Sequence, residues 1–109
     1  MTDLIVVYVT VSSAQEGERI ARALVDERLA ACVNRLGTVR SIYRWEGQVE
    51  QSEEELLMIK TSLERFTAIK QRVSELHSYS VPEIIALPIL AGSEAYLRWL
   101  NEQLTPGET

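Results

Sequence analysis

The clearest pattern in the chain is a pair of unbroken apolar runs, one near each end. The first run, Leu4 to Val11, is rich in β-branched residues, and the second extends from Glu83 to Leu90. Runs without polar alternation are typical of strands that are covered on both faces. We therefore predict a central strand over 4–11 and a last strand over 83–90.

Three other segments have the spacing of amphipathic helices. Ser13 to Glu16 and Thr61 to Glu64 each match a capping box, in which a Ser or Thr side chain satisfies a free N–H at a helix start. Gly92-Ser93 precedes the third helix, and we expect the first to end between Arg28 and Ala30. The apolar positions on the three predicted stripes are Ile20, Ala21, Leu24 and Val25; Phe66, Ile69, Val73 and Leu76; and Tyr96, Leu97 and Leu100.

A long hairpin is predicted between the first two helices. Its strands cover 31–45, with a bulge or bend at Gly37, and 49–61, and Glu46-Gly47 supplies the turn. A strand of about 14 residues at ~3.3 Å per residue spans roughly 45 Å. A compact domain of this size is only very roughly 35 Å across. We therefore expect the hairpin to protrude.

The order strand, helix, strand, strand, helix, strand, helix predicts an α+β fold. It is the ferredoxin-like split βαβ pattern, with a long hairpin and an extra C-terminal helix. We expect one domain over residues 1–104 and a flexible tail over 105–109. Two helices cover one sheet face, so the other apolar face needs a cover. Together with the protruding hairpin, this predicts a closed homo-oligomer.

Composition narrows the class of protein. The 109 residues are 46% hydrophobic and 25% charged, which matches a globular protein, and the net charge of -5 disfavours nucleic acid as a partner. No apolar run approaches the length of a membrane span. Cys32 is the lone cysteine, and its neighbours Ala31 and Val33 predict a buried thiol in a reducing compartment. We expect a cytoplasmic protein.

His77 is the only histidine, and it lies between a predicted helix and the segment that leads to the last strand. At such a boundary an imidazole can face a cleft as a metal ligand or proton exchanger. A histidine in the last turn of a helix also gains from the helix dipole, and this structural interpretation ranks first. Cys32 as a second ligand ranks below its interpretation as a core residue.

A second candidate site centres on Lys60, which interrupts an apolar strand directly before a helix. Lys60 could hold an anion with the N-terminal amides of that helix, or it could reach solvent or pair with Glu83. Trp45 and Tyr79 could line a cleft between subunits, or pack in an interface, where such residues are enriched. The acidic run Glu50 to Glu55 could attract cations, but charged edges usually prevent aggregation.

No known nucleotide, zinc or nucleophile motif occurs at the required spacing, so a cofactor enzyme is unsupported. Ferredoxin-like RNA-binding domains need aromatic platforms on the sheet. The only phenylalanine, Phe66, falls on a predicted helix, which excludes that interpretation.

Several segments together resemble the CutA divalent-cation tolerance family. The resemblance implies a ferredoxin-like subunit in a tight trimer held by the long hairpins, similar to the PII signalling proteins, with no settled catalytic activity. The matching segments are Glu27 to Asn34, Ser41 to Gly47, Ile59 to Thr61, His77 to Tyr79, Val81 to Ile84 and Tyr96 to Leu100.

The chain departs from this family at the positions that imply copper binding. Members that resemble copper binders carry a cysteine on the first strand and two adjacent histidines, whereas this chain has Val9 and Leu76 and keeps only His77. Our first hypothesis is a non-enzymatic homotrimer for response to divalent metal ions, with copper as the first choice. The alternative is a PII-like regulatory module that binds a small anionic ligand between subunits, at a cleft lined by Trp45, Lys60, Tyr79 and Glu83.

Overall fold

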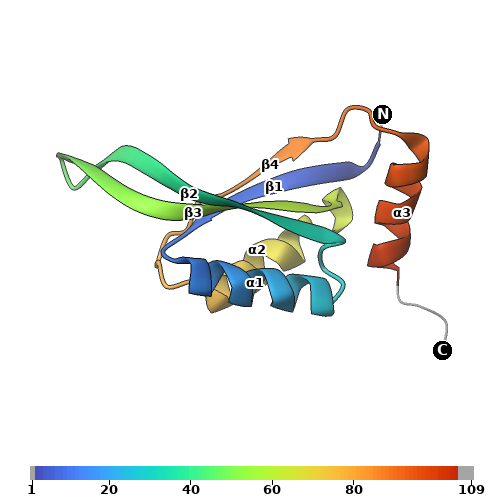
Figure 1. Cartoon of the computed structure of the whole chain (residues 1–109), viewed down its shortest axis with the longest axis horizontal. Helices are drawn as coiled ribbons and strands as arrows, with labels where there is room; N and C mark the ends of the chain where they lie inside the picture. The colour runs from blue at the N-terminus through green and yellow to red at the C-terminus, as the bar shows by residue number, and fades with distance from the viewer. Residues whose placement is uncertain (1, 106–109) are drawn as a thin grey trace.

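One antiparallel sheet carries two helices on one face and a third helix at its end (Figure 1). This computed structural model describes residues 2–105, so most of the predicted tail lies outside the described residues. The elements in chain order are β1 (Leu4–Val11), α1 (Ala14–Asp26), β2 (Cys32–Trp45), β3 (Gln48–Ser62), the 3₁₀ turn η1 (Leu63–Arg65), α2 (Phe66–Leu76), β4 (Ile84–Pro88) and α3 (Glu94–Leu104).

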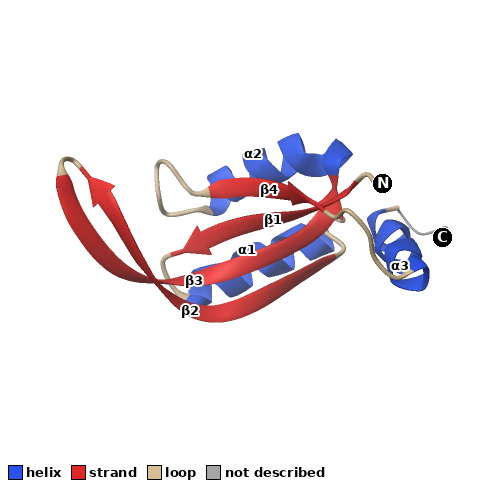
Figure 2. Ribbon diagram, turned by 90° about the horizontal axis from the view of Figure 1, so that it is seen from above, coloured by secondary structure: helices blue, strands red, loops and turns tan. Residues whose placement is uncertain are grey.

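The sheet has the order β2-β3-β1-β4, and every neighbouring pair is antiparallel. Strand β1 is therefore internal, with Val7 opposite Ile59 on β3 and Ala86 on β4. Figure 2 shows α1 and α2 side by side beneath the strands and α3 beyond the sheet end. This arrangement confirms the predicted α+β ferredoxin-like class.

The core lies between the sheet and the first two helices. Alternate residues of β1 point to this side, and Val7, Val9 and Val11 are completely buried. Burial of such a side chain stabilises the fold by ~1.5–3 kcal/mol. Their neighbours in the same cluster include Leu57 and Ile59 from β3, Ile20 and Leu24 from α1, and Ile69 and Val73 from α2.

The opposite sheet face is open, as predicted. Val6 and Tyr8 of β1 are only half-buried there, while Ile85 and Leu87 of β4 are 52% and 46% exposed. The apolar run of β1 therefore serves both faces of the sheet: its odd positions face the helices and its even positions face outward. Helix α3 packs at the sheet end through a separate small cluster that includes Leu100.

The hairpin protrudes, and the molecule measures 49 × 29 × 23 Å (Figure 1). The pairing register shifts between Arg35 and Thr38, where Gly37 has a φ of 87°, so the predicted bulge is confirmed. Glu46 and Gly47 both have positive φ, which a two-residue hairpin turn of the I′ kind requires.

Helix starts follow the sequence prediction in one place and not in the other. The Ser13 hydroxyl accepts from the Glu16 amide, as a helix cap should. The predicted box at Thr61 is wrong, because β3 continues to Ser62 by pairing with β1. The Thr61 hydroxyl instead donates to the Leu29 carbonyl at 2.6 Å. Helix α2 consequently begins through η1 without a side-chain cap.

Two predicted boundaries also move inward. Helix α1 ends at Asp26 because Arg28 adopts a left-handed φ of 57°. Strand β4 covers only Ile84–Pro88, which pair with Val9 to Ile5 of β1.

Candidate functional site

The start of α1 and the end of α2 meet around a buried carboxylate. Glu16 is 5% exposed, and its Oε1 and Oε2 accept hydrogen bonds from the main-chain amides of Ser12 and Ser78, both at 3.1 Å. We call Ser12, Glu16, His77, Ser78 and Tyr79 the Glu16 cluster. It ties the first turn of α1 to the loop that follows α2.

The hydrogen bonds of this cluster keep Glu16 ionised. Burial alone would raise the pKa of Glu16, but the hydrogen bonds from Ser12 and Ser78 lower it. The pKa of Glu16 therefore lies below its ordinary value. At neutral pH the cluster contains a charged acceptor rather than a proton donor.

His77 is completely enclosed, and both of its ring nitrogens have main-chain partners. Nε2 lies 2.7 Å from the Thr10 carbonyl oxygen, and Nδ1 accepts from the Tyr79 amide at 3.0 Å. One donating and one accepting nitrogen assign a neutral imidazole with its proton on Nε2. A metal ion needs a free nitrogen lone pair, so binding at His77 requires that the Tyr79 bond be broken.

The Glu16 carboxylate lies beside His77, with Oε1 3.8 Å from Nδ1, but a tight metal site needs more ligands than these two. Within residues 2–105, no group of three His, Cys, Asp or Glu side chains is placed to hold a metal ion. Cys32 lies opposite Lys60 on the open sheet face, with Sγ 3.8 Å from Asn34 Oδ1. The thiol is half-buried, so the prediction of a core cysteine is wrong; its neighbour Ala31 takes the buried position.

Tyr79 connects the Glu16 cluster to the base of the hairpin. Its hydroxyl donates to Glu54 Oε2 at 3.0 Å, and its ring centroid lies 4.7 Å from that of His77. Burial and the Glu54 carboxylate raise the pKa of Tyr79 to about 12. The phenol therefore remains protonated and acts as a hydrogen-bond donor at neutral pH.

Lys60 lies elsewhere, beside α3. Its Nζ donates to Tyr96 Oη at 3.1 Å and stands 5.3 Å from the centroid of the Tyr96 ring. No salt bridge joins it to Glu83 or to any other carboxylate among the described residues. The alternative of a Lys60–Glu83 pair is therefore absent within this chain.

The four residues of the predicted cleft are dispersed in one subunit. Trp45 is opposite Gln48 at the hairpin tip, whereas Lys60 is at the other end of the same hairpin. The intervening strand spans roughly 40 Å at ~3.3 Å per residue. Tyr79 contacts the middle of β3, and Glu83 directly precedes β4. Only contacts between copies of the chain could bring Trp45 and Lys60 together.

An exposed aromatic pair on α3 was not predicted from the sequence. Tyr96 and Trp99 stack with their ring centroids 5.6 Å apart and an interplanar angle of 27°. Each is 41% exposed, although Tyr96 belongs to the predicted apolar stripe. The available signal was their three-residue spacing on one helix, which places two rings side by side.

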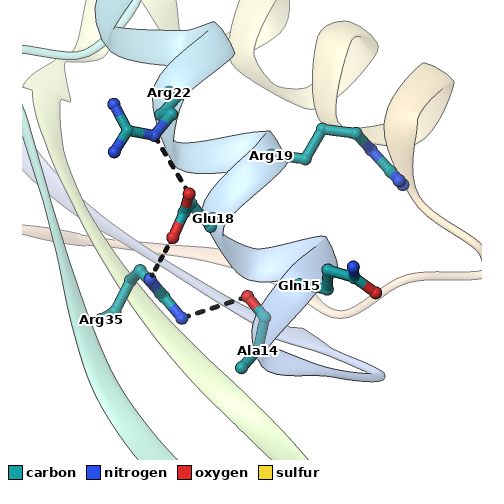
Figure 3. A pocket seen from close by; sticks show the side chains of 6 residues that line it. All are labelled: Ala14, Gln15, Glu18, Arg19, Arg22 and Arg35. Atoms are coloured by element: carbon teal, nitrogen blue, oxygen red, sulfur yellow. Dashed lines mark hydrogen bonds and ion pairs between the residues drawn. The ribbon is translucent and has the colours of Figure 1, made fainter.

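A surface concavity of about 460 Å³ lies beside α1 (Figure 3). Three arginines line it, but Glu18 bridges Arg22 and Arg35, both at 3.3 Å. Figure 3 shows Arg19 directed away from Arg35, and its Nη2 donates to the Leu76 carbonyl. Arg19 and Arg35 hold α1 to α2 and β2, whereas Arg22 pairs within α1, so the three guanidinium groups do not converge on a ligand. None of the helices in residues 2–105 has the length and apolar character needed to cross a bilayer.

The fold and these contacts define a class of protein: a ferredoxin-like α+β domain with an open apolar sheet face and a protruding hairpin. The family model described as "CutA1 divalent ion tolerance protein" matches residues 5–103. The chain therefore belongs to the CutA1 family.

Relatives from several kingdoms agree with this assignment. The divalent-cation tolerance protein CutA of Thermus thermophilus is 53% identical over 97 residues, which are 89% of this chain and 94% of that protein. The chloroplastic CutA of Arabidopsis thaliana is 49% identical over 89% of this chain, which spans only 53% of that longer protein.

Solved structures show the same fold. The Thermus thermophilus divalent cation tolerance protein has a TM-score of 0.90 and 51% identity, covering 92% of this chain and 97% of its own. A protein described as the periplasmic divalent cation tolerance protein CutA of Archaeoglobus fulgidus has a TM-score of 0.91 and 37% identity. The match covers 94% of this chain and 99% of that chain.

Proposed function

We propose that this chain works as a non-enzymatic homotrimer in the response to and tolerance of divalent metal ions, with copper as the first choice. The observation that carries the proposal is the apolar surface that one copy leaves uncovered. The names of its relatives describe divalent-cation tolerance and no reaction. The family resemblance supplies the number three.

The uncovered surface occupies both the open sheet face and the hairpin. Ile42, Val49 and Trp45 near the hairpin tip are 69%, 65% and 55% exposed, in addition to Ile85 and Leu87 on β4. Large contiguous apolar patches are rare on monomers and mark contact surfaces. The two ends of this elongated subunit differ, so a head-to-tail contact that closes into a ring would bury both.

Direct copper binding at His77 is part of this proposal, but only as a weak site. Each ring nitrogen already has a partner, and further strong ligands would have to come from another copy. The lone Cys32 supports the proposed cytoplasmic location, since reducing compartments keep thiols free.

The second candidate function is a PII-like regulatory module that binds a small anion between subunits. The specific observation in its favour is Lys60, whose half-buried ammonium has no carboxylate partner among the described residues. A neighbouring copy could add Trp45, Tyr79 or Glu83 to the same cleft. This arrangement requires the trimer, so both functions share one structural test.

The test is the oligomeric state of a shortened hairpin. Replacing 42–51 by Asn-Gly keeps Ser41 opposite Ser52 and retains the two-residue turn geometry. We expect light scattering to show a trimer for the wild type and a smaller species for the shortened chain. Glu46→Asn, which suits the positive φ at the turn, is the full-length control and should remain trimeric. A wild-type monomer at micromolar concentration would contradict the proposal.

A further inference from the structure

The Lys60 ammonium lies on the open face among groups that do not neutralise it. Its direct strand neighbours are Val6 on β1 and Cys32 on β2, and among residues 2–105 its ammonium donates a hydrogen bond to the Tyr96 hydroxyl alone. An ammonium without a carboxylate partner remains available to an anion, and hydrogen bonds between charged groups are among the strong ones. The described residues supply no such anion.

Lys60 and Tyr96 together offer several hydrogen-bond donors to one ligand. An ammonium has three N–H donors, and only one is directed to Tyr96 Oη. The Tyr96 hydroxyl accepts this bond and donates to no other group within residues 2–105, so its proton is available. With Nζ and Oη 3.1 Å apart, the two oxygens of one carboxylate or phosphate can each accept a bond. The ammonium also polarises the phenol and strengthens it as a donor.

An aromatic platform adjoins these donors. Trp99 stacks on the Tyr96 ring, and both side chains are 41% exposed. Exposed aromatic rings bind a planar ring by offset stacking or edge-to-face contact. A ligand with its charge at Lys60 would therefore place an attached ring against Tyr96 or Trp99.

We propose that Lys60, Tyr96 and Trp99 form a binding site for a small anion that carries a planar aromatic ring. Lys60 and the Tyr96 hydroxyl bind the carboxylate or phosphate, and the Tyr96–Trp99 pair binds the ring. The need for an anion rests on the second proposed function, whereas the ring preference and the role of α3 are new. All three residues come from one copy, so the site does not need the hairpin tip of a neighbour.

Matched probes with and without a ring test the proposal. We would titrate the full chain with benzoate and acetate, and with phenyl phosphate and inorganic phosphate, by NMR at constant ionic strength. Stacking should make each aromatic probe bind about 2- to 10-fold more tightly than its small partner. Trp99→Leu removes half of the aromatic pair and should lower this ratio, while Lys60→Gln should weaken the binding of all four probes. Tyr96→Phe keeps the ring but loses the hydroxyl. It should weaken the binding of all four probes and preserve the ratio of aromatic to small-probe affinity.

Phe66→Leu is the control, because it removes an aromatic ring on α2, on the other face of the sheet from Lys60, and should leave the ratio unchanged. Equal binding of aromatic and small probes, or a ratio unaffected by Trp99→Leu, would overturn the site.

Light scattering on each variant separates the two proposals. If Trp99→Leu breaks the assembly without changing the probe ratio, the aromatic pair is an assembly contact and the ligand site is wrong. If the chain is monomeric but keeps the ratio, the site stands and the trimer fails.

Discussion

Glu16→Gln would test whether the buried carboxylate holds the loop after α2. Each carboxylate oxygen accepts a main-chain N–H at 3.1 Å, from Ser12 and from Ser78. The substitution preserves size but turns one acceptor into an NH₂ donor, so one amide faces a donor and loses its partner. A hydrogen bond to a charged group contributes ~1.5–3 kcal/mol. We therefore expect the unfolding free energy to fall by about 2 kcal/mol at pH 7.

The same substitution has a predicted pH dependence. The pKa of Glu16 is lowered by folding, so its contribution is present above the unfolded-state pKa and is lost as pH falls through the folded-state pKa. Glutamine does not titrate. The stability difference between wild type and Glu16→Gln should therefore be full at neutral pH and narrow as the pH falls below the ordinary value of 4.5.

Urea denaturation at one fixed protein concentration measures this difference, because assembly would make stability depend on concentration. Glu102→Gln is the matched control: Glu102 is exposed on α3, and its change should stay within ~0.5 kcal/mol. A Glu16→Gln loss no larger than that of the control would refute the reasoning. So would a loss of equal size at pH 7 and at about pH 3.5.

Two further predictions concern the same end of the fold. In a calorimetric Cu(II) titration we expect weak binding that His77→Ala removes and Cys32→Ser preserves. His77→Ala should also lower the free energy of unfolding by ~1–3 kcal/mol, because two main-chain groups lose their partner. Tight binding that survives His77→Ala would exclude His77 as the ligand. Gly17→Ala would place Cβ against the Glu55 carboxylate, which Arg35 holds at 2.7 Å. We expect a net loss of about 1 kcal/mol despite the better helix propensity of Ala, and recovery when Glu55→Ala is added; a stability gain in the single variant would contradict the contact.

Local patterns were enough to predict the class of fold. Apolar runs and helical periodicity predicted the order of elements, and Gly37 and Glu46-Gly47 marked the bulge and turn that the structure contains. These features depend on the conformational preferences of neighbouring residues, which a single sequence records directly. The protruding hairpin followed from counting residues against the size of a compact domain, and the open face followed from the two helices that cover one side of the sheet.

Site geometry depended on contacts between distant residues. The same capping spacing occurs at Ser13 and at Thr61, yet only Ser13 begins a helix. Thr61 remains in β3 because it pairs with Ile5 of β1. Cys32 has apolar neighbours but points to the open face, since adjacent residues of a strand alternate between faces. No local pattern indicates which face a short apolar segment will present.

The sequence by itself therefore determined the order of the helices and strands, the topology class and the excess of apolar surface. Tertiary structure alone decided that Glu16 accepts from an amide 62 residues away, that His77 is occupied by main-chain groups, and that Lys60 meets Tyr96. The physical reason is that hydrogen bonds and ion pairs require a few ångströms of separation and defined angles. Such distances are set by strand register and by how helices pack on the sheet, and neither is encoded in any local stretch of residues.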